Sequence, residues 1–223
     1  MRLEENVNLA GHTTLRLGGL ARYFVQAADE QDVQEAVQWA RDEAVPLFVL
    51  GGGSNLLVPD EGFPGLVLRI AIRGVEQHGC SFNVGAGEPW DALVERTVQA
   101  GCAGMECLAG IPGSTGGTPV QNVGAYGQEV SETITSVRAF DRQMGSYVDL
   151  SREACRFRYR ASVFNMDEPG RYIVTSVSFG LRAGGEPALR YADLQRHFAG
   201  RPGIPSLVEV LSLIHISEPT RPY

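Results

Sequence analysis

The stretch 110–127 is the part of this sequence whose composition points most directly to chemistry. It reads GIPGSTGGTPVQNVGAYG, with six glycines, two prolines and no Lys, Arg, Asp or Glu. Ordering this much glycine costs conformational entropy, and so long a loop in a compact domain is usually functional or disordered. A flexible linker is the alternative, but linkers favour Ser, Lys and Glu, whereas this stretch carries Ile111, Val120, Val123 and Tyr126. We predict an ordered loop whose backbone lies close to a flat or anionic ligand.

A glycine triplet forms the second candidate site. Gly51, Gly52 and Gly53 leave an apolar segment and are followed by Ser54 and Asn55. Successive glycines let backbone N–H groups turn inward as an anion-binding nest, for which a diphosphate is the natural occupant. The pattern matches neither G-x-G-x-x-G nor G-x-x-x-x-G-K-[ST], so for GGGSN alone a tight turn is an equal alternative. A Gly52→Val side chain should block a diphosphate, by filling its space or because Gly52 needs a positive φ.

Three arginines form the third candidate. Arg156, Arg158 and Arg160 alternate with Phe157 and Tyr159, so an extended backbone would place all three guanidinium groups on one face. Most surface arginines are simply solvated. Because the planar guanidinium suits bidentate binding of carboxylates, at least one of them could point at an anionic ligand.

Other chemistries lack support in the sequence. Neither Ser54 nor Ser114 lies in the G-x-S-x-G motif of hydrolases. The four cysteines form no C-x-x-C pair and lie far from the histidines, so we expect no metal site and four free thiols in a reducing cytosol. A net charge of −7 without a basic run argues against nucleic acid as a partner. The N-terminus lacks a signal-peptide apolar region and no apolar run could span a membrane, so we expect a cytoplasmic protein.

Alternating and helical patterns predict the elements that position these loops. A strand at 21–27, a helix that begins after Asp29 and is stopped by Pro46, and a strand at 47–50 form a β-α-β unit that leads into the glycine triplet. Further strands are expected at 66–70, 82–86, 131–141 and 172–181, with a helix after Pro89 and a short helix or loop at 191–198. The order of elements predicts an α+β protein, with two subdomains that meet at the glycine-rich loops.

Four segments together resemble one known family. GGGSNLL at 51–57, VGAGEPW at 84–90, IPGSTGGTPVQNVGAYG at 111–127 and CRFRYRASVF at 155–164 occur in the order and spacing of the UDP-N-acetylenolpyruvoylglucosamine reductases, the UDP-N-acetylmuramate dehydrogenases of bacterial peptidoglycan synthesis. The resemblance extends from about residue 6 to about residue 210. The motifs are highly specific in combination, although GGGSN alone would not be.

The resemblance implies a vanillyl-alcohol-oxidase-type (PCMH) FAD-binding module in which two subdomains, 1–72 and 73–210, enclose the cofactor. It implies reduction of FAD by NADPH and then of the enolpyruvyl group of a UDP-sugar, without an obligate protein partner. In the Y-R-x-S-x-F pattern Arg160 matches an active-site arginine that would stabilise charge developing on the substrate carboxylate, and Tyr191 in R-Y-x-D-L matches a tyrosine of the substrate-closing loop. The matching loops assign cofactor contacts to Gly51, Gly52, Gly53, Ser54, Asn55, Leu56, Gly110, Ile111, Pro112, Gly113, Ser114, Gly116, Gly117, Gln121, Asn122, Gly124, Ala125, Tyr126 and Gly127.

The sequence departs from the family after Val210. Residues 211–223, LSLIHISEPTRPY, match nothing in the family and resemble the translation of a sequencing adaptor, so we expect a non-native tail. The family's C-terminal substrate domain, with its proton-donating serine and assisting glutamate, is then missing, and we expect this chain to be an inactive fragment. Two alternatives are an FAD-binding module without catalysis and a sugar or alcohol oxidase of the same superfold. Many of those oxidases attach FAD covalently through histidine, but the four histidines here lie outside both glycine-rich motifs.

Overall fold

The first glycine-rich loop follows a β-α-β unit. The structure is a computed structural model that describes residues 1–217, and it has β2 (Leu20–Ala27), α1 (Glu30–Asp42) and β3 (Leu47–Leu50) where the sequence predicts them. The Asp29 side chain accepts a hydrogen bond from the Asp32 N–H and caps α1, as predicted. The apolar face of α1 is buried against the sheet, so the unit is held by packing as well as by its cap.

This unit belongs to a mixed four-stranded sheet in the order β1-β2-β4-β3. β4 (Phe63–Ile70) lies between β2 and β3 and is parallel to both, whereas β1 (Leu3–Asn8) is antiparallel to β2. The sequence did not predict β1, because no residue of this edge strand is fully buried and its apolar pattern is weak. Since β3 is the other edge strand, the glycine triplet leaves the sheet at an open edge.

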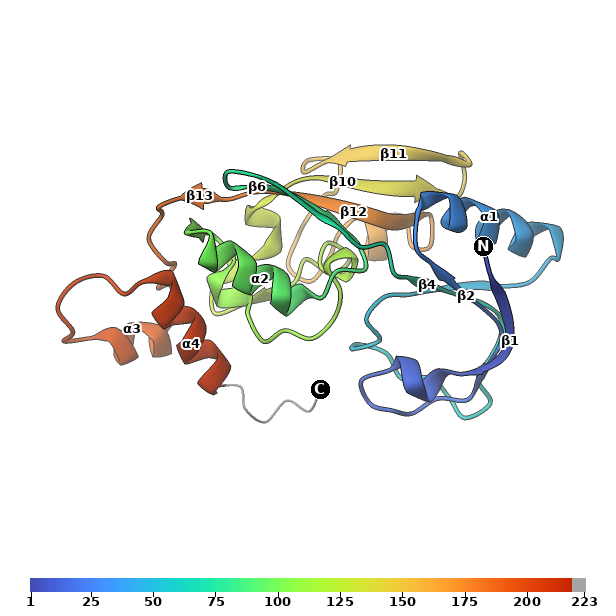
Figure 1. Cartoon of the computed structure of the whole chain (residues 1–223), viewed down its shortest axis with the longest axis horizontal. Coiled ribbons are helices and arrows are strands. Elements are labelled where there is room, and N and C mark those ends of the chain that lie inside the picture. Colours follow the sequence, from blue (N-terminus) through green and yellow to red (C-terminus); the bar gives the residue numbers. More distant parts are fainter. Residues whose placement is uncertain (218–223) are drawn as a thin grey trace.

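The rest of the chain forms a second, fully antiparallel sheet with helices beside it. Its strands follow the order β11-β10-β12-β6-β5. α2 lies beneath this sheet, and α3 and α4 lie at the end of the molecule opposite β1 and β2 (Figure 1). The five strands are β5 (Val75–His78), β6 (Ser81–Gly85), β10 (Ile134–Asp141), β11 (Ser146–Ser151) and β12 (Tyr172–Gly180). The helices are α2 (Trp90–Gln99), α3 (Ala192–Phe198) and α4 (Leu207–Ser217).

Two short hairpin-like pairs and several single turns complete the fold. β8 (Gly124–Ala125) pairs with β9 (Gln128–Glu129), and β7 (Cys102–Ala103) pairs with β13 (Arg182–Ala183). The 3₁₀ turns are Leu9–His12, Glu106–Leu108, Thr115–Gly117 and Val130–Glu132, and Val163–Asp167 forms a π-helical turn. Gly101 follows α2 with φ +69°, the left-handed C′ conformation that favours glycine.

The two sheets share a core and are also joined by a partly exposed ion pair. A single apolar cluster contains residues of β2, α1 and β4 together with residues of β6, α2, β10 and β12. Arg138 on β10 donates to both carboxylate oxygens of Glu30 at 2.7 and 3.1 Å, and Thr175 donates to the same carboxylate. A bidentate arginine pair fixes orientation as well as distance. The mutual position of the sheets is therefore set by contacts 108 residues apart in sequence. The division at residues 72 and 73 stays a prediction.

The prediction of four free thiols is wrong. Cys80, at the turn between β5 and β6, forms a disulfide with Cys102 on β7, with 5.5 Å between their Cα atoms. Cys107 and Cys155 are free and buried, and burial raises the pKa of each thiol to about 12. The sequence could not show the pairing, because 22 residues separate the two cysteines and only the β6-α2-β7 connection returns the chain to Cys80.

Part of the segment predicted as a non-native tail is helical. α4 runs from residue 207 to 217, and Val210 and Ile214 are buried where it packs on α2 and on the turn at 106–108. Residues 218–223 of the predicted tail lie outside the described residues. Packing of an apolar helix does not depend on where its sequence comes from, so the origin of 211–223 stays a prediction. No helix in residues 1–217 combines the length and apolar character needed to cross a lipid bilayer.

Candidate functional site

The two glycine-rich loops come together around one cavity of about 570 Å³. Of the residues assigned from the sequence, those that line it are Gly51, Gly52, Gly53, Ser54, Asn55, Leu56, Ile111, Pro112, Gly113, Ser114, Gly117 and Gln121. Gly116 lines an adjoining cavity of about 320 Å³, which also contains Gly51, Ser114 and Gly117 in its wall. The structure thus brings together two predicted segments that are far apart in sequence.

The loops approach so closely because Gly52 has no side chain. A Cβ at Gly52 would lie 2.7 Å from the Gly113 Cα and 2.9 Å from the Ser114 nitrogen. The sequence-based reason given for Gly52 is therefore wrong in one respect, since it is Gly53 that has a positive φ, of +68°. At Gly53 a Cβ would also lie 2.0 Å from the His12 carbonyl oxygen. One glycine is needed for loop–loop contact and the next for the turn.

Side-chain hydrogen bonds also join the loops. The Ser54 hydroxyl donates to the Pro112 carbonyl oxygen at 2.9 Å, and the Asn55 amide donates to the Gln121 side chain at 3.3 Å. Both bonds cross from the first loop to the second. The polar residues after the triplet therefore hold the two loops in one relative position.

Several backbone donors at this contact have no protein acceptor. Among residues 1–217, no acceptor pairs with the N–H groups of Gly52, Gly53, Ser54, Gly113 or Ser114. Gly52 is exposed, so water can reach its N–H, whereas Gly53 and Ser114 are buried, and a buried unpaired N–H is costly unless water or a ligand accepts from it. Consecutive free N–H groups in a glycine turn are the physical basis of an anion nest. The two loops together therefore offer five donors to an anion such as a diphosphate.

The second loop is also fixed to the start of α2. The Trp90 N–H donates to the Gly113 carbonyl at 3.1 Å, while the N–H groups of Thr115 and Gly116 donate to the carbonyls of Glu88 and Ala86 at 2.8 Å. The Trp90 indole N–H donates to Leu108 at 2.8 Å. Trp90 lines the main cavity, although no site role was assigned to it from the sequence. Phe48, Thr118 and Asn165 line it too, and no site role was assigned to them, although Thr118 belongs to the 110–127 stretch.

Six of the assigned cofactor contacts line neither of these two cavities. These are Gly110, Asn122, Gly124, Ala125, Tyr126 and Gly127. The buried Asn122 amide instead donates to Glu129 at 2.8 Å and to the Arg158 carbonyl at 3.1 Å, and its oxygen accepts from the Ser131 N–H. Asn122 thus holds the loop together from within. The role of these six residues in cofactor binding stays a prediction.

The two residues matched to catalytic positions both contact the β8–β9 hairpin. Arg160 is exposed and donates to the Gly124 carbonyl at 3.1 Å. The Tyr191 ring packs edge-on against Tyr126 with 5.4 Å between centroids, and Arg190 donates to the Gly127 carbonyl at 3.1 Å. Both residues therefore lie beside the end of the second glycine-rich loop rather than beside the glycine triplet.

The extended backbone that would have placed Arg156, Arg158 and Arg160 on one face is not present. The segment is not extended, because Arg156 and Arg160 have positive φ values of 50° and 54° in consecutive turns. Arg156 and Arg158 both face Asp167, at 3.7 and 2.8 Å, whereas no carboxylate in the described part of the chain pairs with Arg160. The turns separate the one guanidinium that lacks a carboxylate partner from the two that have one.

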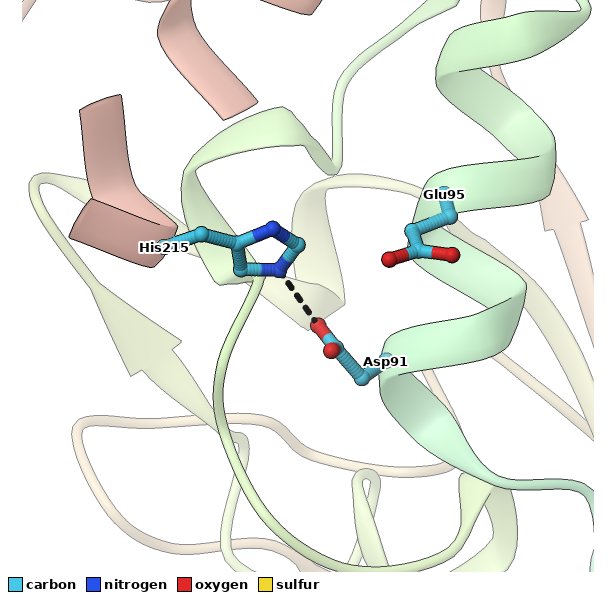
Figure 2. Close-up of side chains that lie close together, drawn as sticks. All are labelled: Asp91, Glu95 and His215. Atoms are coloured by element: carbon cyan, nitrogen blue, oxygen red, sulfur yellow. Dashed lines mark hydrogen bonds and ion pairs between the residues drawn. The ribbon is translucent and has the colours of Figure 1, made fainter. Parts of the chain in front are cut away.

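One further cluster could suggest a metal. Figure 2 shows His215 of α4 facing Asp91 on α2, with Glu95 further along the same helix, and one ligand atom of each lies within 4.8 Å of the others. However, the Asp91 Oδ1 that faces His215 at 3.2 Å already accepts from the Gly110 N–H at 2.7 Å. His215 also belongs to the segment that does not match the family. We assign no metal here, and Asp91 is explained as the anchor of the second loop.

Comparisons with known proteins agree with this geometry. Residues 21–151 match the model of an FAD binding domain family. The chain is 53% identical over 190 residues to the UDP-N-acetylenolpyruvoylglucosamine reductase of Streptomyces coelicolor, and the match covers 84% of this chain and 49% of that protein. The chain thus spans about half the length of the curated relatives it matches.

Solved structures show the same fold. The crystal structure of the UDP-N-acetylenolpyruvylglucosamine reductase from Thermus caldophilus matches with a TM-score of 0.71 at 32% identity, over 93% of this chain and 73% of that one. The 6-hydroxy-D-nicotine oxidase from Arthrobacter nicotinovorans matches with a TM-score of 0.56 at 20% identity, over 73% of this chain and 36% of that one, and indicates the fold alone. The α+β fold is therefore that of the vanillyl-alcohol-oxidase-type FAD-binding module.

Proposed function

This chain belongs to the UDP-N-acetylenolpyruvoylglucosamine reductase family, and we propose that it is the FAD-binding part of such a reductase. In this proposal the whole protein uses NADPH to reduce the enolpyruvyl group of UDP-N-acetylenolpyruvoylglucosamine in peptidoglycan synthesis, and it works in the cytoplasm. The oxidase alternative is less well supported, because the relatives with high identity are named as reductases.

The observation that carries the proposal is the meeting of the two glycine-rich loops around a cavity with five unpaired N–H donors. These donors would bind the diphosphate of FAD. Several closely spaced backbone N–H groups can bind a diphosphate without a lysine. The apolar cavity walls, such as Phe48, Ile111 and Val120, would take the flat ring systems. No histidine is among the described residues that line either cavity, which supports noncovalent binding.

Bound FAD would supply hydride transfer from NADPH to the substrate. Arg160 is the residue of this chain that would act on the substrate. A fixed guanidinium favours the carboxylate of an enolpyruvyl group, and it favours the additional charge of the transition state more than the ground state. The hydrogen bond to the Gly124 carbonyl holds Arg160 against the β8–β9 hairpin, and Tyr191, whose ring packs on Tyr126 of that hairpin, would help to enclose the substrate. We assign the donor of the final proton to no residue of this chain.

A cofactor titration tests the proposal. The purified chain should take up one FAD, become yellow, and release the flavin when denatured by acid or heat. Circular dichroism must first show that the protein is folded. A folded chain that quenches no FAD fluorescence would refute the proposal, and flavin that stays attached to denatured protein would favour the oxidase alternative.

A further inference from the structure

The turn that carries Arg160 has an unfavourable backbone conformation. Arg158 and Ala161 face each other across it, because the Arg158 N–H donates to the Ala161 carbonyl at 2.9 Å and the Ala161 N–H donates to the Arg158 carbonyl at 3.1 Å. Tyr159 and Arg160 form the tip, and Arg160 has a φ of +54°, which residues other than glycine rarely adopt. Such a residue keeps its conformation only where its surroundings hold it. Besides the bond from the Arg160 side chain to Gly124, the restraint must come from residues that flank the turn.

Ser162 joins this turn to the second glycine-rich loop. Its side chain is fully buried, and its hydroxyl donates to the Val120 carbonyl at 2.6 Å and accepts from the Phe164 N–H at 3.1 Å. A buried hydroxyl that both donates and accepts a hydrogen bond is restricted to one position. Val120 lines the main cavity of about 570 Å³. Ser162 therefore connects the Arg160 turn to the wall of this cavity through a single side chain.

Asn165 makes a second connection to the turn. Its side-chain oxygen accepts from the Ser162 N–H at 2.9 Å, and its side-chain amide donates to the Arg160 carbonyl at 3.2 Å. Asn165 also lines the main cavity, so one side chain contacts both the cavity and the backbone of Arg160. On the other side of the turn, the Arg158 carbonyl accepts from the amide of Asn122 in the second loop. These hydrogen bonds hold the backbone of the turn and leave the Arg160 guanidinium exposed.

We propose that Ser162 and Asn165 are positioning residues for Arg160, and that they order its turn when the main cavity is occupied. This inference rests on the proposed function. A ligand that contacts Val120 and Asn165 binds best when both are in place, so it shifts the turn toward its hydrogen-bonded conformation. The guanidinium of Arg160 would then be ordered before a substrate carboxylate arrives. A preorganised charge needs no rearrangement at the moment of reaction, which is the advantage that the two residues would provide.

Hydrogen exchange with and without FAD tests this inference on the chain as it exists. The Ala161 N–H closes the turn, so its exchange rate, followed by NMR, reports how often the turn opens. In wild type, saturating FAD should slow this exchange about fivefold or more, the factor that corresponds to one neutral hydrogen bond. Ser162→Ala should lose most of this slowing. Its FAD affinity should stay within about twofold of wild type, because Ser162 lines neither cavity.

Thr97→Val is the matched control. Thr97 is fully buried on α2, its hydroxyl donates to the Val94 carbonyl at 2.8 Å, and it lines neither cavity. This variant removes a buried hydroxyl of the same kind and should keep the full effect of FAD on Ala161. If Ser162→Ala does not fold, Asn165→Ala, at a half-buried residue, should likewise reduce the effect.

The rates of the two flavin steps give a second measurement. In a version of the protein that spans the full length of the relatives, Ser162→Ala should slow reoxidation of reduced flavin by substrate about fivefold. Reduction by NADPH should keep its rate, because Arg160 acts only on the substrate in this proposal. Equal slowing of both steps would overturn the inference.

The outcomes separate the two proposals. If the wild-type chain binds no FAD, the proposed function fails and the inference fails with it. If FAD binds but does not slow exchange at Ala161, or slows it equally in Ser162→Ala, the inference alone is overturned. Faster exchange throughout β12 in Ser162→Ala would also overturn it, because Ser162 would then stabilise the whole fold rather than the turn.

Discussion

The glycine-loop contact and the β8–β9 hairpin are built in different ways, although both belong to the second glycine-rich stretch. At the contact, Gly52 packs on Gly113, and the loops are fixed by backbone and short side-chain hydrogen bonds. At the hairpin, Arg160 and Tyr191 are exposed and approach from two other segments of the chain. The difference indicates that backbone groups form the proposed cofactor site, whereas exposed side chains beside the hairpin form the proposed substrate end.

The strongest test of this contrast is Gly52→Val. The new side chain meets the Gly113 backbone rather than a flexible side chain, so the loops must separate and we expect FAD binding to be lost, with about 1–3 kcal/mol of stability. FAD titration and chemical denaturation measure the two effects. Gly11→Val is the control, because no atom lies within 4 Å of a Cβ placed there. Normal FAD binding by Gly52→Val would show that the loop contact is not required.

At the β8–β9 hairpin, Arg160→Lys should leave FAD affinity unchanged, because Arg160 lines neither cavity. In a version of the protein that spans the full length of the relatives, reoxidation of reduced flavin by substrate should slow by about 2–4 kcal/mol of barrier, or roughly 30- to 900-fold. Stopped-flow absorbance separates this step from reduction by NADPH, which should keep its rate. Arg158→Lys, at a residue paired with Asp167, is the control. Equal slowing of both steps would indicate a structural role.

A smaller effect is expected at the buried carboxylate that ties the Tyr191 segment to the hairpin. Glu106 is fully buried and accepts from the Gln128 side chain at 2.9 Å, the Ala188 N–H at 2.8 Å and the Gly104 N–H at 2.7 Å. Glu106→Gln places an amide donor against one of these donors and should cost about 1–3 kcal/mol. Hydrogen exchange should accelerate at 188–191 but not at 51–54. Unchanged exchange at Ala188 would contradict this assignment.

The smallest effect is a pH dependence at the end of β10, where Asp141 pairs with Arg171. Hydrogen bonds from Arg171 lower the pKa of the buried Asp141 carboxyl. The stability this pair contributes is complete above the unfolded-state pKa of about 3.9, and it is lost as pH falls through the lower folded-state value. Denaturation midpoints measured below about pH 4 should fall less steeply in Asp141→Asn than in wild type. An equally steep fall in the two proteins would contradict this assignment.

The sequence alone determined the local elements and the existence of the site. The β2-α1-β3 unit follows from its apolar periodicity and the Asp29 cap, and the density of glycine at 51–53 and 110–127 indicated ligand-contacting backbone, because few other functions repay its entropic cost. The family motifs then indicated the fold, which the solved relatives confirm.

Only the tertiary structure decided which residues meet. The Gly52–Gly113 contact, the Cys80–Cys102 disulfide and the hydrogen bond from Ser162 to Val120 all depend on chain segments brought together by the sheet topology. The three alternating arginines illustrate the same limit. An extended backbone would have aligned them, but Arg156 and Arg160 have left-handed backbone conformations that turn the chain. As a result, Arg156 and Arg158 pair with Asp167, whereas Arg160 donates to the hairpin. Sequence spacing fixes which residues are available, and long-range packing fixes where each side chain points.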